Sequence, residues 1–245
     1  EQLEARRSHD LDKPFLESHF ILLCTKNGII KKSSLVDFSR PRANGIIAIN
    51  IHDGDQLVEA KLTNGLNEVV IANRKGRAIR FSESKVRTMG RNAAGVRAIR
   101  LDEDADWVVG MVCVDAHDAA TTILVVSEKG NGKRTALEDY SVTNRGGKGV
   151  RTLKLTEKTG ELVAIKNVND TQDLMITTTQ GVMIRMEAVE LRTMGRATQG
   201  VRLIRLDEGD EIADVTVIDR EEDDPADTLD PAPYLSPADS ADDDE

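Results

Sequence analysis

The chain has 245 residues, enough for one large domain or two ordinary ones, and its 39% hydrophobic content supports a packed core although aromatic residues contribute only 3%. No apolar run approaches the roughly 18 residues that a membrane-spanning helix requires, and no secretory signal opens the chain, so we expect no membrane partner. The net charge of −10 is unevenly placed: residues 220–245 carry eleven acidic side chains and one basic, which leaves residues 1–219 neutral overall.

Two series of turn glycines reveal a repeat. The first comprises Gly28, Gly76, Gly130 and Gly181; the second comprises Gly45, Gly95, Gly149 and Gly200, with spacings of 50, 54 and 51 residues. A period in this range is typical of a solenoid, a propeller or a related array. The sequence therefore predicts a linker or end of a preceding blade (1–17), a repeat domain (18–219) with units at about 18–66, 67–117, 118–170 and 171–219, and a tail (220–245).

Each unit is predicted to form four short strands, because its apolar segments are rich in β-branched residues and bounded by Gly, Asn or Asp. A turn glycine joins the first two strands of each unit as a hairpin. In the second unit we expect strands at 68–73, 77–81, 95–101 and 106–114. In the fourth unit we expect them at 173–179, 182–186, 200–206 and 211–218.

A lone four-stranded sheet cannot cover both of its apolar faces, whereas neighbouring sheets packed face to face can. The sequence therefore predicts an all-β, propeller-like disc of four four-stranded blades, with the connector between the second and third strands on its rim or on one face. The tail holds four of the six prolines and few large apolar groups, so we expect it to be disordered.

Basic residues gather in the connectors and third strands, where acidic residues are few. Equivalent cations on successive blades would form a curved track suited to the phosphates of double-stranded DNA. The alternative is that connectors are simply solvated and strand arginines cover core edges with their stems. In an unbroken strand Arg97 and Arg100 would point to opposite faces, so either a bulge realigns them or only one meets DNA. The predicted DNA contacts are Arg40, Arg42, Arg87, Arg91, Arg97, Lys133, Arg134, Arg145, Lys148, Arg151, Arg192, Arg196 and Arg202.

Two stretches stand out within the repeat. The letters RTMGR begin at Arg87 and again at Arg192, and the similarity continues through GVR and IRLDE. The stretch TNRGGKGV, residues 143–150, surrounds two cations with three glycines, which would let a backbone come close to phosphate. We therefore add Gly146, Gly147 and Gly149 to the predicted DNA contacts.

The sequence shows no constellation typical of an active site or a metal site. Cys24 and Cys113 lie in apolar segments and form no CxxC pair, which predicts two buried, reduced thiols in a cytosolic protein. The four histidines are scattered, and no nucleophile or paired base accompanies them.

The motifs RTMGR…GVR…IRLDE, FSRPRANG, NRKGRAIRF and NGKRTAL resemble the C-terminal domain of the DNA gyrase A subunit, over residues 18–219. The resemblance implies a β-pinwheel whose blades wrap DNA around their outer rim. The family's glycine box, Gln-Arg-Arg-Gly-Gly-Lys-Gly, matches residues 143–149 at five of seven positions, but here it lies in the third visible unit instead of the first blade. We expect the chain to carry blades three to six of a six-bladed domain.

The resemblance further implies a whole subunit that belongs to an ATP-dependent type IIA topoisomerase, introduces negative supercoils and assembles as A2B2 with the gyrase B subunit in the bacterial cytoplasm, at the nucleoid. No catalytic residue or cofactor is expected in this chain. ATP and Mg²⁺ would serve an upstream cleavage domain and the partner subunit, and neither Tyr140 nor Tyr234 is a credible cleavage nucleophile. Two alternatives stay open: the related domain of the topoisomerase IV A subunit, which would serve decatenation, and a propeller scaffold that binds proteins.

The acidic tail is predicted to compete with DNA for the basic track, because a tethered polyanion reaches an effective concentration in the mM range. Deletion of residues 221–245 should therefore tighten DNA binding, measured by fluorescence anisotropy of a labelled duplex at fixed salt. Unchanged or weaker binding after the deletion would contradict competition.

Overall fold

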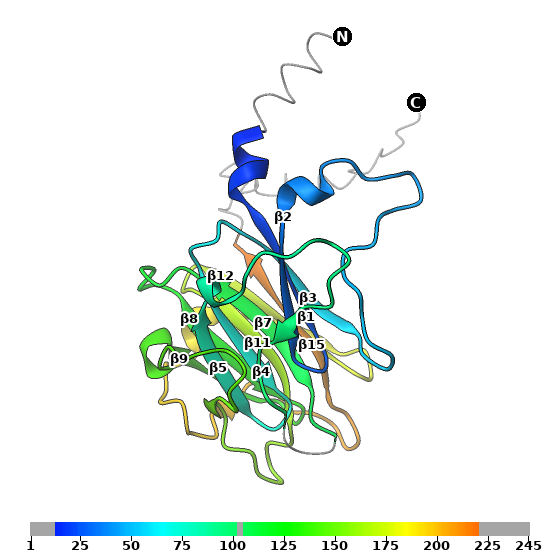
Figure 1. Cartoon of the computed structure of the whole chain (residues 1–245). Helices are drawn as coiled ribbons and strands as arrows, with labels where there is room; N and C mark the ends of the chain where they lie inside the picture. Colours follow the sequence, from blue (N-terminus) through cyan, green and yellow to red (C-terminus); the bar gives the residue numbers. More distant parts are fainter. Residues whose placement is uncertain (1–12, 102–104, 221–245) are drawn as a thin grey trace, which may run out of the picture.

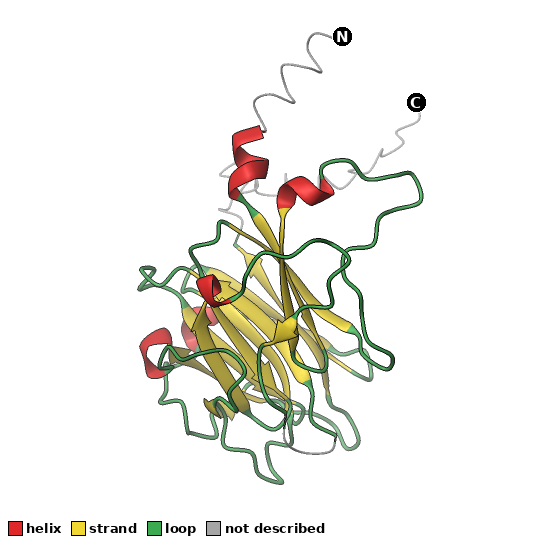
Figure 2. Cartoon of the chain, viewed as in Figure 1, coloured by secondary structure: helices red, strands yellow, loops and turns green. Residues whose placement is uncertain are grey.

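The computed structural model describes residues 13–101 and 105–220, so the predicted tail and most of the predicted linker lie outside the described residues. Residues 13–18 form a short helix, and the chain then builds four antiparallel sheets that stand side by side (Figures 1 and 2). Arg220, which the sequence analysis assigned to the tail, belongs to the folded part, because its guanidinium contacts Asp173 at 2.6 Å and Glu187 at 2.8 Å.

The first sheet has the order β3-β1-β2-β6, with β1 Phe20–Thr25, β2 Ile29–Ser34, β3 Leu57–Thr63 and β6 Val96–Arg97. The second is β10-β5-β4-β7, with β4 Glu68–Asn73, β5 Arg77–Ser82, β7 Val108–Val114 and β10 Val150–Arg151. The third is β11-β8-β9-β14, with β8 Thr122–Ser127, β9 Asn131–Ala136, β11 Leu162–Val168 and β14 Val201–Arg202. The fourth is β13-β12-β15, with β12 Gln172–Thr178, β13 Met183–Glu187 and β15 Ile212–Asp219.

A short 3₁₀ turn follows the second strand of each unit. These turns are η1 Leu35–Phe38, η2 Glu83–Lys85, η3 Leu137–Asp139 and η4 Ala188–Glu190. Each turn starts the connector that runs to the second turn glycine of its unit: Gly45, Gly95, Gly149 or Gly200. All four connectors therefore leave their sheets in the same way.

The all-β, four-bladed architecture is confirmed, but the third strand of each unit differs from its prediction. Residues 95–101 were expected to form one strand within their own unit, yet only β6 is extended, and it pairs with β2 of the preceding unit. The carbonyl of Gly28 accepts the backbone N–H of Ala98 at 2.8 Å, after which the chain bends and buries Ala98 and Ile99 between two sheets. In the same way, β10 pairs with β5 and β14 pairs with β9, so each of these short strands joins the sheet of the preceding unit. We call β6, β10 and β14 the exchanged strands.

The hairpin strands of the middle blades are buried on both faces, because each lies between two neighbouring sheets. In β4, Val69 and Ile71 face the core shared with the first sheet, whereas Val70 and Ala72 face the core shared with the third. This alternation follows from the two-residue period of a strand. It explains why these segments are almost continuously apolar in the sequence.

The sheet order separates a hub from an outer edge. Strands β3, β7, β11 and β15 contact one another in that succession, so they form the inner side of the array. The exchanged strands β6, β10 and β14 lie at the opposite end of their sheets. The connectors follow the same outer side, since Thr88, Val142 and Thr193 bridge to the second strand of the preceding unit.

Buried cations on the second strands hold these connectors. Arg80 pairs with Glu68 and donates to the carbonyls of Leu137 at 2.6 Å and Tyr140 at 3.0 Å, at the 3₁₀ turn of the following unit. Charged groups are expensive to bury unless their hydrogen bonds are satisfied, as they are here. Adjacent blades are therefore joined by side chains as well as by the exchanged strand.

Gly95, Gly149 and Gly200, which we call the junction glycines, directly precede the exchanged strands and lie against the backbone of the preceding unit. We expect these positions not to tolerate a side chain. At Gly149 a Cβ would overlap the carbonyl oxygen of Ala78, whereas at Gly209, which has a similar positive φ, a Cβ would meet nothing within 4 Å. Both Gly→Ala variants bear the left-handed backbone cost of about 1–2 kcal/mol, but only Gly149→Ala adds overpacking of about 1–3 kcal/mol. We expect Gly149→Ala to melt roughly 5 °C below Gly209→Ala in a thermal denaturation; equal melting temperatures would contradict the tight junction.

Candidate nucleic-acid interface

Each exchanged strand places an exposed arginine on the outer edge: Arg97, Arg151 and Arg202. A second exposed cation follows three residues later, at Arg100, Lys154 and Arg205. Both positions are exposed because the strand ends at the first arginine, and in the first two junctions the next two side chains are buried. For an unbroken strand we expected either a bulge that realigns the two cations or contact of only one of them with DNA. Because the strand is short, both cations are exposed without a bulge.

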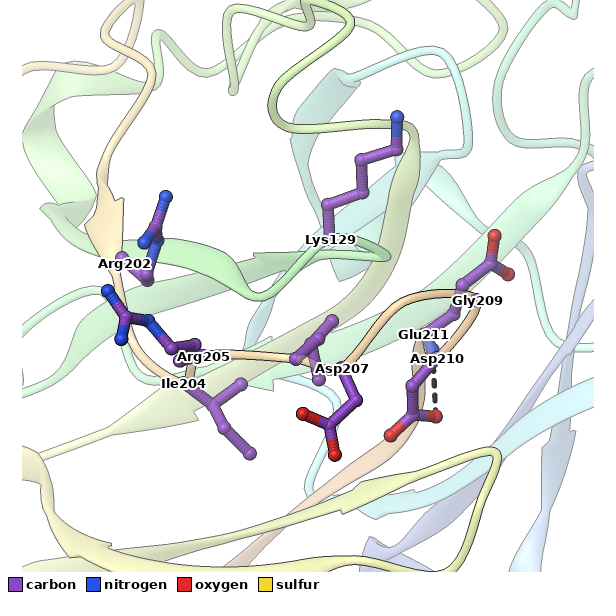
Figure 3. A pocket seen from close by; sticks show the side chains of 9 residues that line it. Lys129, Arg202, Ile204, Arg205, Asp207, Gly209, Asp210 and Glu211 are labelled. Atoms are coloured by element: carbon purple, nitrogen blue, oxygen red, sulfur yellow. Dashed lines mark hydrogen bonds between the residues drawn. The ribbon is translucent and has the colours of Figure 1, made fainter.

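A hairpin-turn lysine of the preceding unit joins two of these pairs. Arg151 and Lys154 line a pocket together with Lys75. Arg202 and Arg205 line a larger pocket together with Lys129, and Figure 3 shows the two arginines on one side of it and Asp210 and Glu211 on the other. Two consecutive junctions therefore each present three cations at equivalent positions, a lysine of the hairpin turn and two cations that follow the junction.

The hairpin lysines were missed at the sequence level, although both occupy the residue directly before a turn glycine. Neither ammonium is free: Lys75 contacts Glu161 at 2.5 Å, and Lys129 donates to the carbonyl of Glu157 at 2.6 Å. The signal that could have found them is the shared position in NRKG and SEKG, once strand exchange brings that turn against the next unit.

The arginine four residues before the junction glycine joins successive connectors. Arg145 donates to the carbonyls of Lys85 at 3.1 Å and Arg97 at 2.9 Å. Arg196 donates to the backbone carbonyls of Asp139 at 3.1 Å and Arg151 at 2.5 Å, and Arg91 donates to the backbone carbonyl of Ile47 at 3.4 Å. These three side chains, which we call the staple arginines, are half-buried. They were predicted as DNA contacts, but their guanidinium groups already hold backbone carbonyls.

The first arginine of each RTMGR stretch has a different environment. Arg87 and Arg192 are exposed, and within the described part of the chain their side chains make no hydrogen bond or ion pair. Arg40 and Arg42, in the connector after η1, are exposed in the same way. These four guanidinium groups therefore remain available to an anion.

The glycine-rich stretch is packed into a junction. Gly146 and Gly149 have φ of +83° and +69°, and Gly149 lies against the backbone of Ala78. Gly146 N–H donates to Ala98 at 2.6 Å, and Gly147 accepts from the N–H of Arg100 at 2.9 Å. These glycines thus shape the contact between blades, while the side chain of Lys148 is exposed.

Two predicted DNA contacts are corrected by burial. Lys133 is fully buried, and its ammonium donates to the backbone carbonyls of Gly195 at 2.7 Å and Arg196 at 2.5 Å and to the hydroxyl of Thr198 at 3.1 Å. Burial, with a smaller effect of the Arg196 charge, lowers the pKa of Lys133 from its usual 10.5 to about 8. Arg134 is also buried and donates to Ala188 at 2.9 Å, so both cations fix connectors and lie out of reach of a phosphate.

The described residues were also searched for a nucleophile, a reactive thiol and a metal site. Tyr140 is fully buried against the hydroxyl of Thr152, and burial raises the pKa of its phenol, so it cannot act as a nucleophile toward DNA. Cys24 is buried and Cys113 half-buried; both thiols are free, and burial raises their pKa values, that of Cys113 to about 12. Residues 13–101 and 105–220 contain no cluster of metal-ligating side chains, and none of their helices has the length and apolarity to cross a membrane.

The four units coincide with a known repeat. The model of the DNA gyrase C-terminal domain, a β-propeller, matches residues 19–64, 67–115, 121–169 and 172–219. The chain belongs to this family. Its relatives include the DNA gyrase A subunit of Staphylococcus epidermidis, 43% identical over 207 residues, and that of Staphylococcus aureus MRSA252, 42% identical over 207 residues. Each alignment covers 84% of this chain but only 23% of the relative.

Solved structures place the fold in the same family. The C-terminal domain of DNA gyrase A superimposes with a TM-score of 0.73 at 26% identity, over 82% of this chain and 66% of the other. The C-terminal domain of DNA topoisomerase IV gives a TM-score of 0.77 at 24% identity, over 82% of this chain and 62% of the other, which is a likeness of fold alone.

The two arginines of RTMGR should respond differently to truncation. Arg196→Ala removes two hydrogen bonds to carbonyls of the preceding connector and should cost about 1–3 kcal/mol of unfolding free energy. Arg192→Ala removes an exposed side chain and should stay within about 0.5 kcal/mol of the parent. Urea unfolding of the two variants measures the difference, and equal stability losses would contradict the staple role.

Proposed function

We propose that the chain binds duplex DNA along its outer edge, without reading base sequence, and bends the duplex around the blades. The observation that carries the proposal is the recurrence of exposed cations at equivalent places in successive junctions: Arg97 and Arg100, then Arg151 and Lys154, then Arg202 and Arg205. Equivalent positions on neighbouring blades form a path along one side of the array, which a phosphate backbone can follow.

Affinity on such a surface comes from counterion release and does not depend on base contacts. Each phosphate that an arginine or lysine neutralises frees condensed cations from the duplex. Bending a short site costs about 1–6 kcal/mol, so several such contacts must act together to hold a curved duplex. The overall neutrality of residues 1–219 is no obstacle, because the exposed cations are concentrated on the outer edge.

In the whole protein, the domain would serve the A subunit of a gyrase. The chain spans about a quarter of the length of its curated relatives. On the basis of those relatives, we propose that the whole protein cleaves DNA strands, assembles as A2B2 with the B subunit and lies in the cytoplasm. It would use ATP and Mg²⁺ and introduce negative supercoils. Similarity of 42–43% to proteins named as DNA gyrase A subunits supports gyrase over topoisomerase IV, whose domain shares the fold at lower identity.

A salt titration tests the DNA proposal against a protein-binding scaffold. The logarithm of the DNA association constant should fall linearly with the logarithm of salt concentration, with a slope of about −0.9 per phosphate contacted. Replacing Arg202 and Arg205 together by Gln should weaken binding and reduce the magnitude of that slope by about 2. Fluorescence anisotropy with several unrelated duplexes measures both quantities.

A matched control removes two positive charges from the hub. Lys61 and Lys166 lie on β3 and β11, so the double variant Lys61→Gln/Lys166→Gln has the same net charge but an intact outer edge. Its slope should equal that of the parent. Equal slopes for the two double variants, or no salt dependence at all, would reject the proposed DNA path. Wrapping, as distinct from binding, should also change the linking number of a nicked plasmid that is ligated in the presence of the protein.

A further inference from the structure

The residue opposite the exposed arginine of each exchanged strand differs from one junction to the next. It is Ile29 at β6 and Asn131 at β14, but at β10 the exposed Arg151 lies opposite another arginine, Arg77. Arg77 directly follows a turn glycine, is exposed, and was not among the residues predicted to contact DNA. The junction between the second and third units therefore places two arginines at opposed strand positions on the outer edge.

Arg77 holds the backbone of the next unit directly before its exchanged strand. Its Nε donates to the carbonyl of Lys148 at 3.1 Å, and its Nη2 donates to the carbonyl of Gly149 at 2.8 Å. The carbonyl of Gly147 accepts the backbone N–H of Arg100 at 2.9 Å, so the second unit binds three successive carbonyls. Because β10 itself has only two residues, these bonds extend the attachment of the strand and fix the direction in which it enters the sheet.

The other two junctions hold their connectors with a buried lysine of the second strand. Lys31 donates to the carbonyl of Arg91, and Lys133 donates to the carbonyl of Gly195; both lysines are fully buried. The corresponding residue of the second unit is Ile79, whose side chain has no donor. In this junction an exposed cation, Arg77, therefore supplies hydrogen bonds to the connector from the outer edge.

Two opposed arginines repel each other unless their charges are compensated. Like charges directly across a strand pair destabilise it, and Lys154, which lines a pocket with Arg151, adds a further positive charge nearby. The two bound carbonyls stabilise the guanidinium of Arg77. The side chain of Arg151 makes no hydrogen bond or ion pair within the described part of the chain. An anion bound by Arg151 would relieve this repulsion, which favours a phosphate at this position.

We propose that Arg77 is a positioning residue for DNA binding: its two hydrogen bonds fix the entry of β10, so that Arg151 is held where it can contact a phosphate. The inference rests on the proposed function and adds to it a side chain that acts through Arg151. Holding the short strand in place reduces the entropy that Arg151 loses when it binds DNA. Lysine would keep the charge at position 77 but would lack the planar fork whose Nε and Nη2 match two adjacent carbonyls.

The charge-conserving substitution Arg77→Lys tests the proposal in the full chain. Fluorescence anisotropy of a labelled duplex should show affinity about fivefold to tenfold lower near 0.1 M salt, the effect of losing one phosphate contact. The slope of the logarithm of the association constant against the logarithm of salt concentration should fall in magnitude by about 1, although the net charge is unchanged. The matched control is Arg192→Lys, because Arg192 is exposed and its side chain holds no carbonyl in the described residues. Its affinity should stay within about twofold of the parent, since lysine preserves the point charge.

A double-variant cycle separates positioning of Arg151 from a general loosening of the junction. In an Arg151→Gln background, Arg77→Lys should cause no further loss of affinity, since the side chain that it positions is already absent. A loosened junction would instead displace Lys154 as well, and affinity would fall again. Equal losses in the two backgrounds, or an Arg77→Lys variant that binds DNA like the parent, would overturn this inference. A parent chain whose DNA binding does not depend on salt would reject the proposed function itself, so the two failures are distinguishable.

Discussion

The exchange of a two-residue strand between neighbouring units is the interaction on which the other features of this protein depend. Because β6, β10 and β14 hydrogen-bond to the sheet of the preceding unit, no interior blade is complete without its successor. The close approach of two backbones leaves no room for side chains at the junction, which explains why glycines recur there. Each connector must then run along the outer edge, and its cations are placed there as a consequence.

Positive charge in this chain has two roles that composition does not distinguish. Arg80, Lys133 and Arg134 are buried, and their donors hold carbonyls of the following connector. The cations of the exchanged strands are exposed at the end of the sheet farthest from the hub. The first group makes the connectors rigid, and the second is displayed on them. Rigid display reduces the entropy that a charged side chain and its loop lose on binding an extended anion.

The hairpins were predictable from sequence because β-branched runs around a turn glycine are local signals, and strands β4, β5, β12 and β13 lie where they were expected. The third strands were not predictable, since Ala98 and Ile99 look like strand residues but are buried by a bend against another unit. Lys133 resembled a surface cation because its acceptors, Gly195 and Arg196, lie more than 60 residues away. The glycines of a junction recur in the sequence, but the sequence around a buried cation does not show which carbonyls it holds across the junction.

The repeated RTMGR stretch can now be explained by its two arginines. The second arginine has a counterpart in the third unit, Arg145, so each of the last three units has one, and in each case it holds the connector of the preceding unit. The first unit has Pro41 at that position. The first arginine, by contrast, is exposed in two units and is replaced by Ser141 in the third. A residue needed to join blades must recur at every junction, whereas a cation that adds to a long-range field is needed only on some blades.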